Sequence, residues 1–303
     1  MISRGYLVTA LFGLAVSPLS AQSPAAPAPT PAHISALYHV GYWVRDIEKS
    51  RAFYETYLGF AEPYTLNYPA GGLQMVVIKV NEGQSILLFP NPSKILPNGD
   101  NLDHLGLVTD NAAALHDQIA AKGAKASAVH RARVRDLIFG IRDPDGHPYE
   151  VTQFEMDGQL MKHQGQSLPA TRISTRLRSA TITVADLGAS LRYYCDRLGF
   201  KETWRMSSPD GALDQVELRV PDGTSGVVLK PYTPRTGDGT PRAVPEFCLE
   251  VPDVSKAVAI LQQRAALGGF PLPNPITTGL NGQRRTSCVD PDGTQVVLME
   301  SAR

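Results

Sequence analysis

The chain has 303 residues, of which 43% are hydrophobic and 19% charged, a composition typical of a globular protein long enough for two domains. Acidic and basic residues are equal in number, so the zero net charge argues against a chain that binds nucleic acid or an acidic surface through its overall charge. The three cysteines show no CxxC spacing, which excludes a zinc ribbon. We expect small buried thiols, or one disulfide in an oxidising compartment.

The first 33 residues are predicted to serve export and not to fold. Arg4 precedes an apolar run from Tyr6 to Val16, and small residues lead to an expected cleavage after Ala21, so we interpret residues 1–21 as a signal peptide. The alternative is an uncleaved anchor, but the apolar run is short for a membrane span. Residues 22–33 are rich in proline and alanine and predict a disordered spacer. These features predict an exported protein of the bacterial periplasm, without a stable membrane span after processing.

The next segment alternates predicted strands and one helix, and then repeats that order. Asp46 is placed to cap the first helix, and Gly59 can end it in a left-handed conformation. The predicted strands are 38–44, 74–80, 84–89, 104–108, 137–142 and 147–154, and the predicted helices are 47–57 and 112–121.

The second half of the chain repeats the first. The segment 46–60 matches 186–200, and the turn Asp143-Pro144-Asp145-Gly146 returns as Asp290-Pro291-Asp292-Gly293. We therefore divide the chain into a first repeat at 34–156, a linker at 157–173 and a second repeat at 174–303. The predicted elements of the second repeat are strands 180–184, 215–220, 226–230, 247–251, 285–289 and 294–299, with helices 189–198 and 255–264. This pattern predicts an α+β fold of mostly antiparallel sheet with helices on one face.

Three residues of the first repeat predict a metal site. His39 and His104 lie in the first strand of each half of that repeat, and Glu150 lies in its last strand. Two imidazoles and one carboxylate form a facial triad that leaves coordination positions open for substrate or water. Glycines 41 and 106 would keep the same strand face open near a ligand.

The second repeat does not preserve this set. Ser179, Glu246 and Val297 occupy the places of His39, His104 and Glu150, and valine cannot ligate a metal. We expect a metal-free second repeat that supports the first or forms a second binding cup.

The motifs as a group resemble the vicinal oxygen chelate superfamily over residues 36–300. They are His39 to Asp46, Phe53-Tyr54, Leu58-Gly59-Phe60, His104 to Val108, and Asp143 to Gly146 followed by Glu150. That superfamily includes glyoxalase I, fosfomycin-resistance enzymes, extradiol ring-cleaving dioxygenases, methylmalonyl-CoA epimerase and the metal-free bleomycin-resistance binding proteins. The resemblance implies paired βαβββ modules that form a cup in each domain, and a divalent metal held by His39, His104 and Glu150. The strand 85–89 carries no carboxylate, which disfavours a glyoxalase I-like site with four ligands.

The resemblance leaves several functions open. The leading hypothesis is a metal-dependent lyase or isomerase that chelates two neighbouring oxygens of a small substrate. The alternatives are an extradiol-type Fe(II) dioxygenase and a non-catalytic small-molecule binding protein. The sequence does not distinguish Fe, Mn, Zn and Ni as the metal, and it identifies no general base. We expect the chain to be a monomer of two domains or a homodimer. We interpret Trp43, Arg133 and Arg135 as candidate substrate-binding residues, although a basic loop at 130–135 is also compatible with plain solvation.

Overall fold

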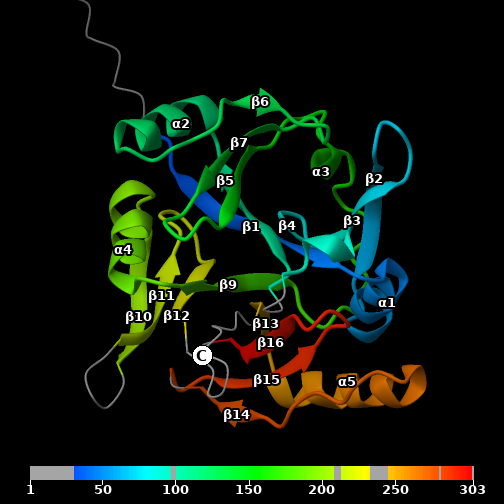
Figure 1. Cartoon of the computed structure of the whole chain (residues 1–303). Helices are drawn as coiled ribbons and strands as arrows, with labels where there is room; N and C mark the ends of the chain where they lie inside the picture. The colour runs from blue at the N-terminus through cyan, green and yellow to red at the C-terminus, as the bar shows by residue number, and fades with distance from the viewer. Residues whose placement is uncertain (1–30, 97–99, 208–212, 233–244, 280, 302–303) are drawn as a thin grey trace, which may run out of the picture. The chain divides into compact units, whose positions relative to one another are not determined.

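Each repeat forms one curled sheet around a line of pairing between its two halves. The computed structural model describes residues 31–96, 100–207, 213–232, 245–279 and 281–301, and the predicted signal peptide lies outside them. These residues form two eight-stranded sheets, the first within 34–153 and the second within 176–300 (Figure 1). The fold class predicted from the sequence, α+β with two tandem sheets built from βαβββ modules, is confirmed.

The first sheet has the order β2-β3-β4-β1-β5-β8-β7-β6. Its centre is the antiparallel pair β1–β5, and each of these strands is flanked by a parallel partner, β4 or β8. Two strand–helix–three-strand modules therefore meet along β1 and β5. The strands are β1 (Ile34–Val44), β2 (Ala61–Asn67), β3 (Leu73–Asn81), β4 (Gln84–Pro90), β5 (Leu102–Thr109), β6 (His130–Arg131), β7 (Leu137–Arg142) and β8 (Pro148–Gln153).

The second sheet has the equivalent order, β10-β11-β12-β9-β13-β16-β15-β14. Its central pair is β9–β13, flanked by the parallel partners β12 and β16. The strands are β9 (Arg176–Val184), β10 (Lys201–Ser207), β11 (Leu213–Arg219), β12 (Gly226–Pro231), β13 (Glu246–Val251), β14 (Thr277–Thr278), β15 (Arg284–Val289) and β16 (Gln295–Glu300).

The predicted helices are present with one change of geometry. Asp46 accepts hydrogen bonds from the backbone amides of Glu48 and Lys49, as expected of a cap, and Gly59 has a φ of 80°. The predicted helix 47–57 is α-helical only over α1 (Ile47–Arg51) and continues as a π-helical turn, η1 (Ala52–Tyr57); α4 (Leu187–Arg192) and η3 (Tyr193–Arg197) repeat this arrangement. The remaining helices are η2 (Pro92–Lys94), α2 (Ala112–Ala121), α3 (Gln159–Lys162) and α5 (Val254–Gly268).

The linker is held against the first repeat by a buried lysine. Lys79 is fully buried on β3, and its ammonium donates to the carbonyls of His163 and Gln166 and to the carboxylate of Glu82. These acceptors satisfy a charge that would be costly to bury alone. The segment 157–173, predicted as a linker, therefore contains α3 and is hydrogen-bonded to the first repeat.

The two faces of the first sheet have different neighbours. On β3 and β4, Ile78 and Ile86 belong to the large hydrophobic core, whereas Val77 and Leu87 belong to a smaller apolar cluster on the other face. Successive strand residues point to opposite faces of the sheet. A strand with apolar neighbours on both faces therefore has an uninterrupted hydrophobic sequence.

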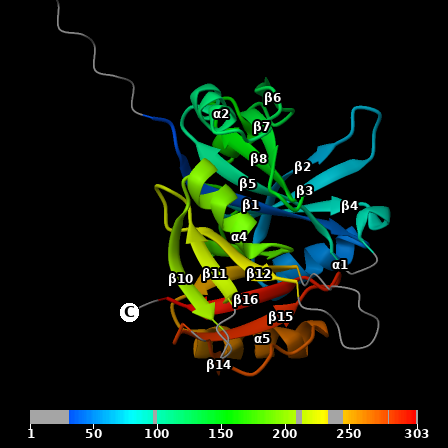
Figure 2. The same cartoon turned by 60° about the vertical axis from the view of Figure 1, so that its left-hand side comes forward.

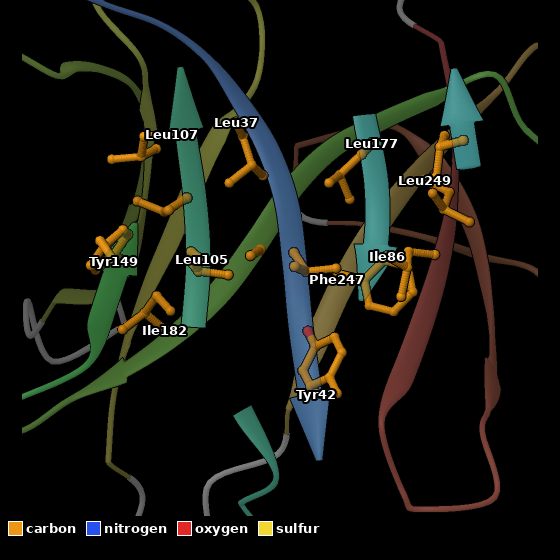
Figure 3. Close-up of a cluster of buried hydrophobic side chains, with 14 of the residues drawn as sticks. Leu37, Tyr42, Ile86, Leu105, Leu107, Tyr149, Leu177, Ile182, Phe247 and Leu249 are labelled. Atoms are coloured by element: carbon orange, nitrogen blue, oxygen red, sulfur yellow. The ribbon is translucent and has the colours of Figure 1, made fainter. Parts of the chain in front are cut away.

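The large core is shared by the two repeats. Tyr42 of β1 packs against Phe247 of β13 with ring centroids 5.8 Å apart, and Leu37 and Leu177 belong to the same buried cluster (Figure 3). The chain from Pro31 onward accordingly forms one unit. The core faces of the sheets stabilise each other, which leaves the opposite face of each sheet free for a cup.

Reciprocal hydrogen bonds join the repeats at the two Asp-Pro-Asp-Gly turns. The hydroxyl of Tyr54 on η1 donates to buried Asp290 at 3.0 Å, and that of Tyr194 on η3 donates to buried Asp143 at 2.9 Å. The second aspartate of each turn also crosses between repeats: Asp292 accepts from the Arg45 amide and Asp145 from the Ala185 amide, each at 3.0 Å. The helix of each repeat is thus anchored to the last hairpin of the other.

Among the described residues, no helix combines the length and the apolar character required to cross a bilayer.

We predict that Tyr54→Phe destabilises the protein by about 1.5–3 kcal/mol, because it removes a hydrogen bond to a buried carboxyl group. Tyr193→Phe is the matched control, since the Tyr193 hydroxyl is buried without a partner among the described residues. Urea unfolding should show a lower midpoint for the first variant and an unchanged or higher midpoint for the second, which removes a hydroxyl buried without a partner among the described residues. Equal midpoints for both would contradict a stabilising role for the contact between Tyr54 and Asp290.

Candidate metal centre

Three adjacent strands bring His39, His104 and Glu150 together. In the register, His39 of β1 lies opposite Gly106 of β5, and Gly106 lies opposite Glu150 of β8. His104 precedes Gly106 by two residues and therefore points to the same face. One potential ligand atom from each of the three residues lies within 4.8 Å of the other two.

Two glycines make room for the two imidazoles. A Cβ at Gly106 would overlap the ring of His39, and a Cβ at Gly41 would lie 3.2 Å from Nδ1 of His104. Each histidine thus occupies the space above a glycine of the paired strand. The sequence suggested that these glycines open the face to a ligand, and in the structure the imidazoles of the two candidate metal ligands occupy the space that they open.

The two imidazoles approach each other closely. Their Nε2 atoms lie 2.8 Å apart, and His39 Nδ1 is buried without a hydrogen-bond partner among the described residues. Burial, together with the nearby His104, places the pKa of His39 well below its ordinary value. His39 is therefore neutral at physiological pH and presents a lone pair, as metal binding requires.

Asp103 orients the second histidine. Its carboxylate lies 2.6 Å from Nδ1 of His104, which leaves Nε2 directed at the site. Burial opposes protonation of His104, but the hydrogen bond to Asp103 and the charge of Glu150 outweigh it, so its pKa is raised. A carboxylate on the outer nitrogen of a ligating histidine fixes the tautomer and strengthens the ligand.

These observations fit a divalent ion. Two nitrogens at about 2.1 Å from an ion lie about 3 Å apart in neighbouring coordination positions, close to the observed separation. The donor set is two imidazoles and one carboxylate, and Glu150 accepts only one contact from Thr152, at 3.3 Å, among the hydrogen bonds of the described residues. The residues would bind a metal through His39 Nε2, His104 Nε2 and a Glu150 oxygen.

The site opens into a cavity of about 310 Å³ on the cup face of the first sheet. One wall is apolar and includes Leu66, Met75, Leu87 and Phe89. The polar lining consists of the three candidate ligands and of Tyr38, Tyr64, Gln74, Asp103, His130, Arg133, Asp136 and Thr152.

Asp136 is a titratable group of this cavity that the sequence reasoning did not identify. Burial raises its pKa to about 6, and the charges of Glu150, Glu155 and Asp157 act in the same direction, while a hydrogen bond from the Glu155 amide opposes them. Gly158 lies so close that a Cβ there would overlap the Asp136 carboxylate. A carboxyl group with a pKa near neutrality can accept or donate a proton at physiological pH.

The three candidate substrate-binding residues have different positions. Arg133 lines the cavity, and its guanidinium donates to the side chain of Gln74 and to the carbonyl of Asn67. Arg135 pairs with Asp157 and Trp43 packs against Phe89, and neither residue contributes to the lining.

Two features of the sequence gave weak signals. Asp103 directly precedes a predicted ligand, but adjacent strand residues normally point to opposite faces, so its bond to His104 was not expected. Asp136 lies in a loop whose path is set by tertiary contacts. His147 follows the Asp-Pro-Asp-Gly turn and is partly buried, and its Nδ1 lies 2.8 Å from Asp143.

The second repeat has different side chains at the equivalent places. Cys248 occupies the place of Gly106, and Ser179 lies opposite it where His39 would be. Cys248, Val297 and Met299 form a small buried cluster. Glu246 accepts from Thr181 at 2.6 Å and pairs with Lys230 at 3.1 Å, so its charge is neutralised without a metal.

Comparison with known proteins identifies a family that matches both repeats. The family model described as the glyoxalase/bleomycin resistance protein/dioxygenase superfamily matches residues 36–151 and 176–298. A search of curated proteins gave no match.

Three similar solved structures illustrate the likeness. A variant of homoprotocatechuate 2,3-dioxygenase from Brevibacterium fuscum is 17% identical, with a TM-score of 0.67 over 91% of this chain and 74% of that one. The Mn(II)-bound glyoxalase from Novosphingobium aromaticivorans is 17% identical, with a TM-score of 0.65 over 89% and 83%. The 2,3-dioxygenase LapB from Pseudomonas sp. KL28 is 15% identical, with a TM-score of 0.67 over 89% and 92%.

At these identities the structural likeness is evidence of the fold alone, whereas the family match covers both repeats. The chain belongs to the glyoxalase/bleomycin resistance protein/dioxygenase superfamily.

Proposed function

We propose that the protein is a divalent-metal-dependent enzyme that binds two neighbouring oxygen atoms of a small substrate in the first repeat and catalyses a lyase or isomerase reaction. The observation that carries the proposal is the grouping of His39, His104 and Glu150 at one end of a cavity of about 310 Å³. A bound divalent ion would act there as a Lewis acid toward the substrate oxygens.

Other residues of the cavity would support this chemistry. Asp103 holds the tautomer of His104, and Arg133 is placed to bind an anionic substituent at the cavity wall. Asp136 would accept a proton from a carbon next to a carbonyl group, since its pKa of about 6 keeps it mostly ionised at neutral pH. The apolar wall would exclude water from the reacting carbon.

Ring cleavage of a catechol by dioxygen is the second candidate. Three ligands leave room for two substrate oxygens and dioxygen, and the wall of Leu87 and Phe89 suits an aromatic ring. His130 lies in the lining of the same cavity and would be available there as an acid or base. Two similar structures are named as 2,3-dioxygenases, which adds weight to this candidate.

We further propose that the mature enzyme acts after export, because residues 1–21 have the pattern of a signal peptide. Cell fractionation of the expressed full chain would test this.

Glu150→Gln should abolish metal binding, because the amide lacks the charge that completes the donor set. Metal analysis of the purified protein should find about one ion per chain in the wild type and less than about a tenth of that in the variant. Asp103→Asn should weaken affinity by about 10- to 100-fold in chelator competition.

Glu246→Gln is the matched control in the second repeat, where it removes a carboxylate at the place equivalent to His104. Its metal content should equal that of the wild type. Retention of the ion by Glu150→Gln would exclude the proposed centre.

Gly106→Ala should reduce metal content without removing any ligand, because the added methyl group displaces the ring of His39. Gly140→Ala on β7 is the control, since its nearest neighbours would lie 3.6 Å or more from the new Cβ. A Gly106→Ala protein with full occupancy would show that His39 does not need its present position.

The reaction class can be tested on the metal-loaded enzyme with two panels. Compounds with two neighbouring oxygens and a carbon–hydrogen bond beside a carbonyl group should exchange that hydrogen in D2O, without oxygen uptake. The rate should fall as the pH drops toward the pKa of Asp136, which is about 6 without a metal and lower once a bound ion offsets the charge of Glu150, and Asp136→Asn should lose this dependence. Oxygen consumption with catechols and no exchange would replace the lyase or isomerase proposal with ring cleavage.

A further inference from the structure

A second large cavity lies between the repeats, away from the metal centre. It is a groove of about 1290 Å³ between the segment that follows α2, the β7–β8 hairpin and the helix α4–η3 of the second repeat. Figures 1 and 2 show α2 and α4 as neighbours along this side. No residue of the groove lines the metal cavity.

The groove has an excess of positive charge. Its five cationic residues are Lys122, Lys125, Arg142, Arg192 and Arg197, and its two carboxylates are Asp143 and Asp196. Asp143 is buried and already accepts hydrogen bonds from Tyr194 and from backbone amides.

The cations of the groove lack acidic partners. No carboxylate of the described residues forms an ion pair with any of the five, although Arg142 and Arg197 donate to the backbone carbonyls of Gly146 and Gly123. The side chains of Lys122, Lys125 and Arg192 form no hydrogen bond with the described residues. Their ammonium and guanidinium groups are available to a ligand.

Tyr193 shows a further difference between the two junctions. It lines the groove but is only 5% exposed, and its hydroxyl is buried without a hydrogen-bond partner among the described residues, so the oxygen is out of reach of a ligand in the groove. The equivalent residue of the first repeat is Phe53, which has no hydroxyl to satisfy.

At the equivalent junction, between η1 of the first repeat and α5 of the second, residues that follow α5 occupy the space that corresponds to the groove. There α5 has 15 residues where α2 has 10, and the segment after it places Phe270 on Tyr57 with ring centroids 5.0 Å apart. The hydroxyl of Tyr57 donates to the carbonyl of Pro271 at 2.9 Å.

The two junctions also differ in the charge of the residues at equivalent positions. Ala52, Tyr57 and Val289 stand where the groove has Arg192, Arg197 and Arg142. The junction on one side of the repeat pair is therefore filled by Phe270 and carries Arg264, whose guanidinium donates to the carbonyl of Tyr57, whereas the other side is an open groove with five cationic residues.

We propose that this groove binds a small organic anion with a phosphate or carboxylate head group and an apolar body. Lys125 and Arg192, from different repeats, would bind the anionic group from opposite walls. Pro144 and Pro148 of the β7–β8 hairpin would provide apolar contact for the body.

Titration calorimetry on metal-free protein tests the proposal, with phenyl phosphate and benzoate as separate probes. At least one probe should saturate a single site with a Kd below about 1 mM, and the tighter one identifies the head group. Lys125→Gln combined with Arg192→Gln should weaken that binding by at least about tenfold.

Two controls make the result specific. Lys201→Gln combined with Arg219→Gln removes the same charge from the exposed surface of β10 and β11 and should leave the affinity unchanged. Glu150→Gln should also bind normally, because it alters only the metal cavity. The absence of saturation, equal weakening by the surface pair, or loss of binding in Glu150→Gln would each overturn the proposal.

Discussion

Two buried aspartates, each hydrogen-bonded to a tyrosine of the other repeat, are the contacts on which the arrangement of this protein depends. Asp143 and Asp290 lie at the start of equivalent turns, and Tyr194 and Tyr54 reach them from equivalent π-helical turns. A buried carboxyl group needs a donor, and here each repeat supplies it to the other. Because the contact is reciprocal, the core faces of both sheets are held together and both cup faces remain accessible.

This near-symmetric frame carries asymmetric chemistry. In the first repeat, Gly41 and Gly106 leave the space that two imidazoles require. In the second, Thr181 and Cys248 take those places, and Ser179 and Glu246 stand where the two imidazoles would be. The donors and the glycines must change together, since an imidazole at either place would collide with a side chain on the paired strand.

The asymmetry extends to the junctions between the repeats. One is sealed by Phe270 stacked on Tyr57, whereas the other leaves a groove lined by unpaired cations. A zero net charge conceals this local excess, because the compensating acidic residues lie elsewhere on the chain. The two repeats therefore differ from each other at two places, the cup face of each sheet and the junctions between the repeats.

The fold class and the internal repeat could be predicted from the sequence, because strand periodicity and turn chemistry act over a few residues. The triad of His39, His104 and Glu150 was predicted from its placement on strands together with the resemblance to a known superfamily. The prediction missed β2 and β10, whose pairing depends on the neighbouring strand. The contact of Asp103 with His104, the place of Asp136 in the cavity and the pairing of Arg135 with Asp157 are visible only in the folded chain. The physical reason is that these contacts join residues through loop paths and sheet curvature, which depend on packing across the whole chain and leave no periodic signal in the sequence.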